Sequence, residues 1–216
     1  SNKGTYCLGA SVEEMKVPRR GVPERALLLV DYPSVEDPPP GRRNEEERLL
    51  TEALHGSLQA RWPDVHFSVL TPYKDQKEDF QRTQEVPIDD AHTWDSMQGL
   101  QRKGVIVIFT RTGEGWNPGQ TSRPLTLRQK IGFLWDVRRL CVATSRASDV
   151  MILVASRELL QIIPEMEVIL EWFRATGRVL TMASDQLLSR ITQPGETRRF
   201  ALRRAGRTKL RALAVQ

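Results

Sequence analysis

Short runs of apolar residues recur along the chain, and longer polar segments separate them. The runs show no alternation of apolar and polar positions, which is the pattern of strands buried on both faces. Such strands occur in parallel sheets that helices cover on two sides. The predicted strands span residues 26–31, 66–70, 105–110, 150–155 and 179–182.

The segments between these runs have the features of helices. Asn44 is the predicted N-cap of the first helix, because three glutamates follow it where the helix dipole favours negative charge. Apolar residues then recur at helical spacing at Leu50, Ala53, Leu54 and Leu58. Further helices are predicted over residues 74–82, 137–147 and 165–175, and a long loop over 113–123. This alternation of strands and helices predicts an α/β fold with a mostly parallel sheet and helices on both faces.

The length and composition allow one sizeable core, since 39% of the 216 residues are hydrophobic. We expect a domain over residues 25–185, an N-terminal extension over 1–24 and a basic C-terminal segment over 186–216. Seven Lys or Arg residues fall between positions 198 and 211 of that segment. A cluster of this kind is typical of a solvated tail, and a phosphate-binding arm is the alternative.

Several classes of protein are not expected. The longest apolar runs are too short to cross a bilayer, and nothing near Ser1 resembles a secretion signal. We therefore expect an intracellular protein, nuclear or cytoplasmic, without membrane contact. The two cysteines and three histidines are scattered, so neither a disulfide framework nor a metal site is predicted.

Three polar segments are expected at the carboxyl ends of strands, where open parallel sheets bind their ligands. They are Thr-Pro-Tyr-Lys-Asp-Gln at 71–76, His-Thr-Trp-Asp-Ser-Met-Gln-Gly at 92–99 and Leu-Cys-Val-Ala-Thr-Ser-Arg-Ala at 140–147. Each resembles a motif of superfamily 1B helicases, the group that includes senataxin and the nonsense-mediated-decay helicase. The corresponding patterns are T-P-Y-x-x-Q, T-x-D-S-x-Q-G and R-L-N-V-A-x-[ST]-R-A.

Three further patterns occur in the order of the same family. Asn44-x-x-Glu47 resembles its N-x-x-E before a long helix, and residues 105–111 resemble the strand and Arg after its Gln-Gly motif. Residues 131–140 are similar to I-G-F-L-x-D-x-R-R-L, the most specific of these patterns. The resemblance covers residues 44–155 and is to the second, C-terminal RecA-like domain of these helicases. It implies a RecA-like fold of the P-loop NTPase type.

Arg146 is the candidate catalytic residue. Phosphoryl transfer from ATP needs cationic groups near the γ-phosphate, and a positioned Arg there contributes about 10³ to 10⁵ in rate. By resemblance Arg146 is this arginine finger, held by a helix beside a buried strand. A surface Arg in a salt bridge is the alternative.

The resemblance also implies which side chains face the nucleotide. They are Gln76, Lys77, Gln98, Gly99, Gln101 and Arg111. Lys77 stands where the family more often has Arg, Gln101 where it commonly has Glu, and Cys141 where it has Asn. A Lys lacks the planar fork of Arg, so its phosphate contact is that of a point charge. For Gln76 and Lys77, a solvated pair on an exposed helix is the alternative.

The resemblance further implies contacts with a single nucleic-acid strand. The residues concerned are Thr71, Tyr73, Thr93, Trp94 and Ser96. Hydroxyl groups hold phosphates without reading the base sequence. The alternative for the Thr and Ser residues is capping of a helix or closure of a turn. Trp94 either stacks on a base or belongs to the core.

No G-x-x-x-x-G-K-[ST] loop occurs in the chain, so ATP and Mg²⁺ would be shared with a first RecA-like lobe absent from it. We interpret the chain as the second motor lobe of an ATP-dependent RNA or DNA helicase, inactive alone. Its expected partners are that N-terminal lobe, single-stranded RNA or DNA, and other proteins. The alternatives are a catalytically degenerate helicase-like scaffold or protein-interaction module, and a domain that binds RNA through its basic C-terminal segment.

Overall fold

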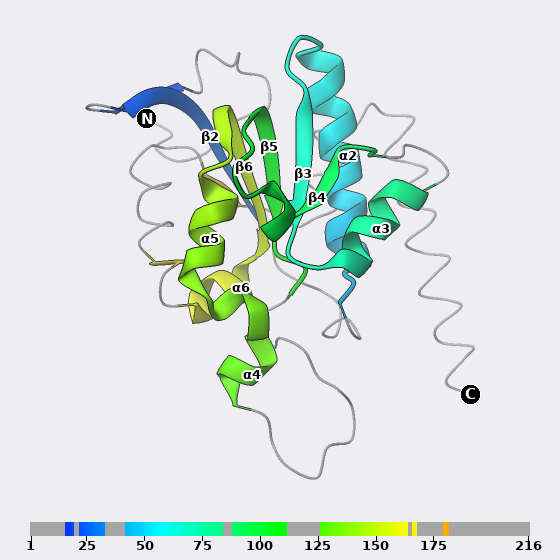
Figure 1. The fold of residues 1–216 in the computed structure, drawn as a ribbon, viewed down its shortest axis with the longest axis vertical. Coiled ribbons are helices and arrows are strands. Elements are labelled where there is room, and N and C mark those ends of the chain that lie inside the picture. The colour runs from blue at the N-terminus through cyan, green and yellow to red at the C-terminus, as the bar shows by residue number, and fades with distance from the viewer. Residues whose placement is uncertain are drawn as a thin grey trace.

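A computed structural model of the chain describes residues 16–19, 22–32, 42–83, 88–111, 126–163, 166–167 and 179–181 (Figure 1). A central sheet has the strand order β1-β2-β6-β5-β3-β4, and β7 also pairs with β2. β1 pairs with β2 in antiparallel fashion, and the other described pairings are parallel. The strands are β1 (Lys16–Arg19), β2 (Val22–Tyr32), β3 (Phe67–Thr71), β4 (Ala91–Thr93), β5 (Arg102–Ile108), β6 (Ala147–Ser156) and β7 (Val179–Thr181).

Helices cover both faces of this sheet. They are α2 (Glu45–Arg61), α3 (Lys74–Arg82), α4 (Leu127–Ile131), α5 (Val137–Thr144) and α6 (Arg157–Ile162), with the 3-10 helices η1 (Asp95–Met97) and η2 (Gly132–Trp135). α2 and α3 lie on one face, whereas α5 and α6 lie on the other (Figure 1). The predicted α/β fold, with a mostly parallel sheet between two layers of helices, is therefore confirmed.

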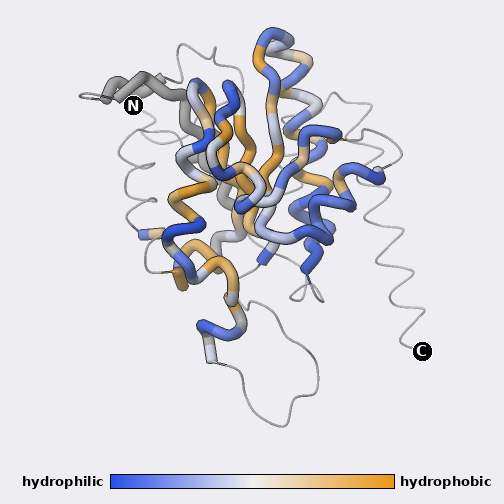
Figure 2. The backbone as a smooth tube through the Cα atoms, viewed as in Figure 1, coloured by the Kyte–Doolittle hydropathy of each residue, from blue (hydrophilic) through white to orange (hydrophobic). Residues whose placement is uncertain are grey.

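Alternate residues of the central strands belong to two cores. Ile106 and Ile108 of β5 pack with α2 and α3, whereas Val105, Val107 and Phe109 pack with α5 and α6. All five side chains are buried. Figure 2 shows the resulting apolar layer in the middle of the fold, with hydrophilic residues on the outer helices. Because both faces of the strand are covered, its sequence is an unbroken apolar run.

Some element boundaries differ from the predicted ones. The helix predicted over 137–147 ends at Thr144, and β6 already begins at Ala147. The backbone N–H of Arg102 donates a hydrogen bond to the carbonyl of Arg146. The chain therefore begins to pair with β5 directly after α5. The elements β1, α4 and α6 were not expected, because segments of four to six residues carry too little periodicity to be recognised.

The sheet begins earlier than the predicted domain. β1 lies in the predicted N-terminal extension, and the predicted boundary at residue 25 falls inside β2. The predicted loop over 113–123, the segment 186–216 and most of the helix predicted over 165–175 lie outside the described residues. None of the helices that the structure describes is long and apolar enough to span a membrane.

Candidate nucleotide and nucleic-acid site

A polar cluster lies where β3 and β5 end. The hydroxyl oxygens of Thr71 and Thr110 are 3.2 Å apart there, and both residues are fully buried. Arg111 Nε donates a hydrogen bond to Tyr73 Oη at 3.2 Å, and the guanidinium carbon lies 4.8 Å from the centroid of the Tyr73 ring. The structure thus brings three of the predicted site residues, Thr71, Tyr73 and Arg111, to the carboxyl end of the sheet.

Glu47 holds the backbone of this cluster. Its carboxylate accepts hydrogen bonds from the backbone N–H of Phe109, at 3.3 Å, and from that of Thr110. Thr110 has a φ of 67°, a left-handed conformation that is unfavourable for a β-branched residue. The two hydrogen bonds to Glu47 stabilise this turn. Glu47 is itself placed by Asn44, whose side chain accepts its backbone N–H at 3.0 Å and so caps α2 as predicted.

Gln76 is fully buried and joins α3 to the start of α2. Its Oε1 accepts a hydrogen bond from the Asn44 N–H at 2.6 Å, and its Nε2 donates one to the Asn44 carbonyl at 3.3 Å. The interpretation of Gln76 as a solvated side chain is therefore wrong, because both ends of its amide have partners inside the protein. Lys77 is partly exposed. Contact of either residue with a nucleotide stays a prediction.

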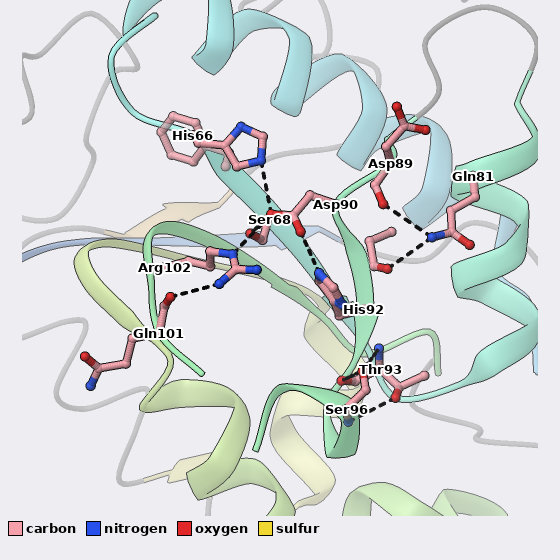
Figure 3. A network of polar contacts seen from close by, with 12 residues as sticks. His66, Ser68, Gln81, Asp89, Asp90, His92, Thr93, Ser96, Gln101 and Arg102 are labelled. Atoms are coloured by element: carbon pink, nitrogen blue, oxygen red, sulfur yellow. Dashed lines mark hydrogen bonds and ion pairs between the residues drawn. The ribbon is translucent and has the colours of Figure 1, made fainter. Parts of the chain in front are cut away.

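Thr93 and Ser96 close a turn at the end of β4 (Figure 3). The backbone N–H of Thr93 donates to Ser96 Oγ at 3.0 Å, and the backbone N–H of Ser96 donates to Thr93 Oγ1 at 3.2 Å. Thr93 lies opposite Thr71 in the pairing of β4 with β3. The contacts support turn closure as one role of both residues, and their contact with phosphates stays a prediction.

Trp94 packs in the core, which is one of its two predicted roles. Its side chain is fully buried, and its ring lies 5.4 Å from that of Phe109 and 5.9 Å from that of Phe133, measured between centroids. The rings of Phe133 and Tyr73 are 5.8 Å apart. Gly132, with a φ of 58°, ends α4 and directs Phe133 into this aromatic group. The Gly-Phe pair of the helicase-like pattern therefore has a packing role here.

Arg146 lies against the turn formed by Gln98 and Gly99. Its Nη1 donates hydrogen bonds to the carbonyl of Met97 at 3.4 Å and to that of Leu100 at 3.2 Å. Gly99 has a left-handed φ of 82°, which this turn requires. Gln98 and Gly99 are exposed and Arg146 is partly exposed, so a ligand can reach this surface.

The two groups of residues lie at opposite ends of β5. Gln101 comes directly before β5 and Arg146 directly before the neighbouring β6, whereas Arg111 follows the end of β5. A strand of seven residues separates the groups by about 20 Å. The expected position of segment 140–147 at the carboxyl end of a strand is therefore wrong, because this segment leads into β6. The predicted nucleotide-facing residues are divided, with Gln76 and Arg111 at the far end from Arg146.

A comparison with known protein families identifies the family to which the chain belongs. A family of domains described as AAA domains matches residues 16–158 of the chain. The chain belongs to this AAA domain family. The match starts at the first residue of β1 and includes every candidate site residue from Thr71 to Arg146.

The AAA domain is also similar in sequence to a protein that is named as an ATP-dependent helicase. Over 119 residues it is 29% identical to an uncharacterized ATP-dependent helicase of Methanocaldococcus jannaschii. The match covers 54% of this chain and 15% of the archaeal protein. The AAA domain therefore corresponds to a small part of that relative.

Two glycine substitutions are expected to change the stability of the AAA domain in opposite directions. A Cβ atom at Gly56 or Gly99 would meet no atom within 4 Å, so backbone conformation alone decides the outcome. Gly99→Ala should lower stability by about 1 kcal/mol because φ is 82° there. Gly56→Ala, inside α2, should raise it by about 0.5 to 1 kcal/mol. Urea unfolding of both variants is the measurement, and shifts of the same sign would contradict the expectation.

A second polar network, which the sequence did not indicate, surrounds Asp90 (Figure 3). The carboxylate bonds to Nε2 of His92 at 2.5 Å and to Nε2 of His66 at 3.1 Å. It also accepts hydrogen bonds from the hydroxyl of Ser68 and, at 3.4 Å, from Nε of Arg102. Burial acts to raise the pKa of the Asp90 carboxyl. The hydrogen bonds from Ser68 and His92 and the charges of His92 and Arg102 outweigh it and lower that pKa from 3.8 to about 2.

Asp90→Asn is expected to make the free energy of unfolding of the AAA domain depend less on pH in the acid range. Since the pKa of Asp90 is lowered in the folded chain, its ionised form stabilises the fold above pH 3.8, and this contribution is lost as the pH falls toward about 2. The asparagine variant should be less stable than the wild type near neutral pH and should lose less stability across that acid range. Urea unfolding at a series of pH values measures both effects. Parallel profiles for the two chains would show that the network does not act through ionisation of Asp90.

Proposed function

We propose that this AAA domain is the second, C-terminal RecA-like lobe of a superfamily 1B ATP-dependent helicase. Family membership and similarity to a protein named as an ATP-dependent helicase support an ATP-driven motor. The observation that carries the proposal is the position of Arg146. It lies between α5 and β6 and against the exposed turn at Gln98 and Gly99. Rigid support and an accessible surface are what an arginine finger needs.

The nucleotide would bind at this turn. ATP supplies the γ-phosphoryl group, and negative charge spreads over the oxygens of that group during transfer. The Arg146 guanidinium would neutralise part of the charge, while the side chains of Gln98 and Gln101 would orient the nucleotide beside it. The described residues contain no group of three or more His, Cys, Asp or Glu side chains arranged to hold a metal ion. The chain has no G-x-x-x-x-G-K-[ST] sequence, and in this proposal the first lobe supplies the phosphate-binding loop and holds Mg²⁺.

Single-stranded RNA or DNA would bind toward the other end of β5. Thr71 and Tyr73 are buried in that region, whereas Thr93 is partly exposed and Ser96 is exposed. We therefore assign the direct phosphate contacts to Thr93 and Ser96, and to Thr71 and Tyr73 the support of the surface beneath them. Hydroxyl contacts hold a strand without reading its bases, as a motor that moves along any sequence requires.

One segment of chain connects the two regions. It starts at Thr93, continues through η1, and ends at Leu100, whose carbonyl accepts a hydrogen bond from Arg146. Trp94 and Met97 anchor the segment in the core, and η1 contacts α5. We place the coupling between nucleic-acid binding and ATP hydrolysis in this segment.

The proposal requires a first lobe in the natural protein, and ATP hydrolysis by that protein tests it. We expect single-stranded RNA or DNA to stimulate hydrolysis, and the same measurement with each polymer identifies the preferred one. Hydrolysis should depend on added Mg²⁺. A protein that binds no ATP and hydrolyses none with either polymer would overturn the proposal.

A second candidate function is that of a helicase-like scaffold or protein-interaction module. Three departures from the helicase patterns favour it, namely Lys77, Gln101 and Cys141. All three side chains are exposed or partly exposed, where a partner protein can reach them. A scaffold would lack ATP turnover, and the first lobe of its parent protein would lack the lysine of the phosphate-binding loop.

A further inference from the structure

We propose that Ser145 is a positioning residue for Arg146, an inference that rests on the proposed function. Ser145 Oγ accepts hydrogen bonds from two nitrogens of the Arg146 guanidinium, from Nη2 at 2.6 Å and from Nε at 3.2 Å. These two donors lie on one edge of the planar group. A single hydroxyl therefore fixes both the position and the rotation of the guanidinium.

Hydrogen bonds fix both the backbone and the hydroxyl of Ser145. It is the C-cap of α5, and its backbone N–H donates to the carbonyls of Cys141 at 3.1 Å and Val142 at 3.3 Å. Its hydroxyl donates to the Val142 carbonyl at 3.1 Å. A serine hydroxyl has one proton and two acceptor sites. Val142 takes the proton and Arg146 takes both acceptor sites, so the orientation of the hydroxyl is determined.

The remaining contacts of Arg146 show which part of its guanidinium a ligand can use. Nε also donates to the Val142 carbonyl at 2.9 Å, and Nη1 donates to the carbonyls of Met97 and Leu100. An Arg side chain has five N–H groups, of which Nη1 and Nη2 carry two each. Among the described contacts, one N–H of Nη2 has no acceptor. Ser145 holds the other N–H of this same nitrogen, so the hydroxyl sets the direction in which the available N–H points.

The hydroxyl should therefore affect the rate of the chemical step more than the binding of ATP. A displacement of about 1 Å in a catalytic group costs on the order of 10²-fold in rate. Without the hydroxyl, the guanidinium keeps its charge and its other carbonyl partners, so a partial effect is expected. We expect Ser145→Ala to lower kcat for ATP hydrolysis by about 10- to 100-fold, with KM for ATP changed by less than about threefold.

The test uses the natural protein with both lobes and compares Ser145→Ala, Ser145→Thr and Arg146→Ala by steady-state ATP hydrolysis. Threonine keeps the hydroxyl, so the Ser145→Thr variant should have a kcat within about threefold of that of the wild type. In the Arg146→Ala background, Ser145→Ala should have no further effect on kcat, because the group that it positions is gone. Thermal unfolding of each variant accompanies the kinetics, and the Ser145→Thr variant separates loss of the hydroxyl from any change in folding.

The outcomes distinguish this inference from the proposed function. If Arg146→Ala leaves ATP turnover unchanged, the proposed function is wrong and the positioning role fails with it. If Arg146→Ala abolishes turnover but Ser145→Ala matches the wild type, only the positioning role is overturned. Equal losses in Ser145→Ala and Ser145→Thr would also overturn it, since the hydroxyl would then not be the group that matters.

Discussion

Arg146→Ala is expected to lower ATP turnover of the natural protein by about 10³-fold or more, with affinity for single-stranded nucleic acid nearly unchanged. The described hydrogen bonds of the Arg146 side chain are to Val142, Ser145, Met97 and Leu100, and none is to Thr93 or Ser96, which we assign to the polymer. Removing the guanidinium should therefore lower the rate of ATP hydrolysis without weakening the binding of the nucleic-acid strand. The measurements are steady-state ATP hydrolysis and equilibrium binding of a labelled single strand.

Arg138→Ala is the matched control for this change. Arg138 lies on α5, eight positions before Arg146, but its side chain is 87% exposed and pairs with Asp136 at 2.9 Å. Its loss should leave turnover close to that of the wild type. Arg146→Lys should give an intermediate rate, because an ammonium group keeps the charge but lacks the guanidinium edge on which Nε and Nη2 both bond to Ser145. Normal turnover in Arg146→Ala would remove this residue from the catalytic role.

Glu47→Ala is expected to give the largest loss of stability, about 2 to 5 kcal/mol. The Glu47 carboxylate is fully buried and accepts the backbone N–H groups of Phe109 and Thr110. Without it, both N–H groups lose their acceptor in a buried region, and the left-handed turn at Thr110 loses its support. Urea unfolding of the 216-residue chain measures the loss.

Two further variants test whether the carboxylate is responsible. Glu47→Gln keeps one acceptor oxygen and should lose roughly half as much stability. Glu78→Ala on α3 removes a carboxylate whose partners among the described residues are the largely exposed Lys74 and Arg82, and it should cost less than about 0.5 kcal/mol. A Glu47→Ala variant no less stable than Glu78→Ala would show that the turn after β5 does not depend on this residue.

Much of the fold could be predicted because the relevant information is local. The unbroken apolar runs of β5 and β6 reflect burial on both faces, and the helix predicted over 74–82 has the bounds of α3. Asn44 was recognisable as a cap because polar residues of its type bond the first turn of a helix. These features depend on neighbours within a few positions, so the sequence alone contains them.

The arrangement of the candidate site depends on contacts between distant residues, and these were harder to predict. Gln76 has the composition of a surface residue, but its amide bonds to Asn44, 32 positions away. Arg111 belongs by pattern to a nucleotide site, whereas the direction of β5 places it beside Tyr73. Sequence patterns gave the residue types, and the strand directions determined which of them meet.

The order of the strands has a consequence for how the domain is made and divided. β6 lies between β2 and β5, and Ala26 of β2 pairs with Val150 of β6. During synthesis, β2 must therefore wait for β6 to leave the ribosome before it joins the sheet through this pairing. A fragment that stops before Ala147 would leave two apolar strands with unpaired edges, which are prone to aggregation. Truncated forms intended for expression should keep the whole of β6.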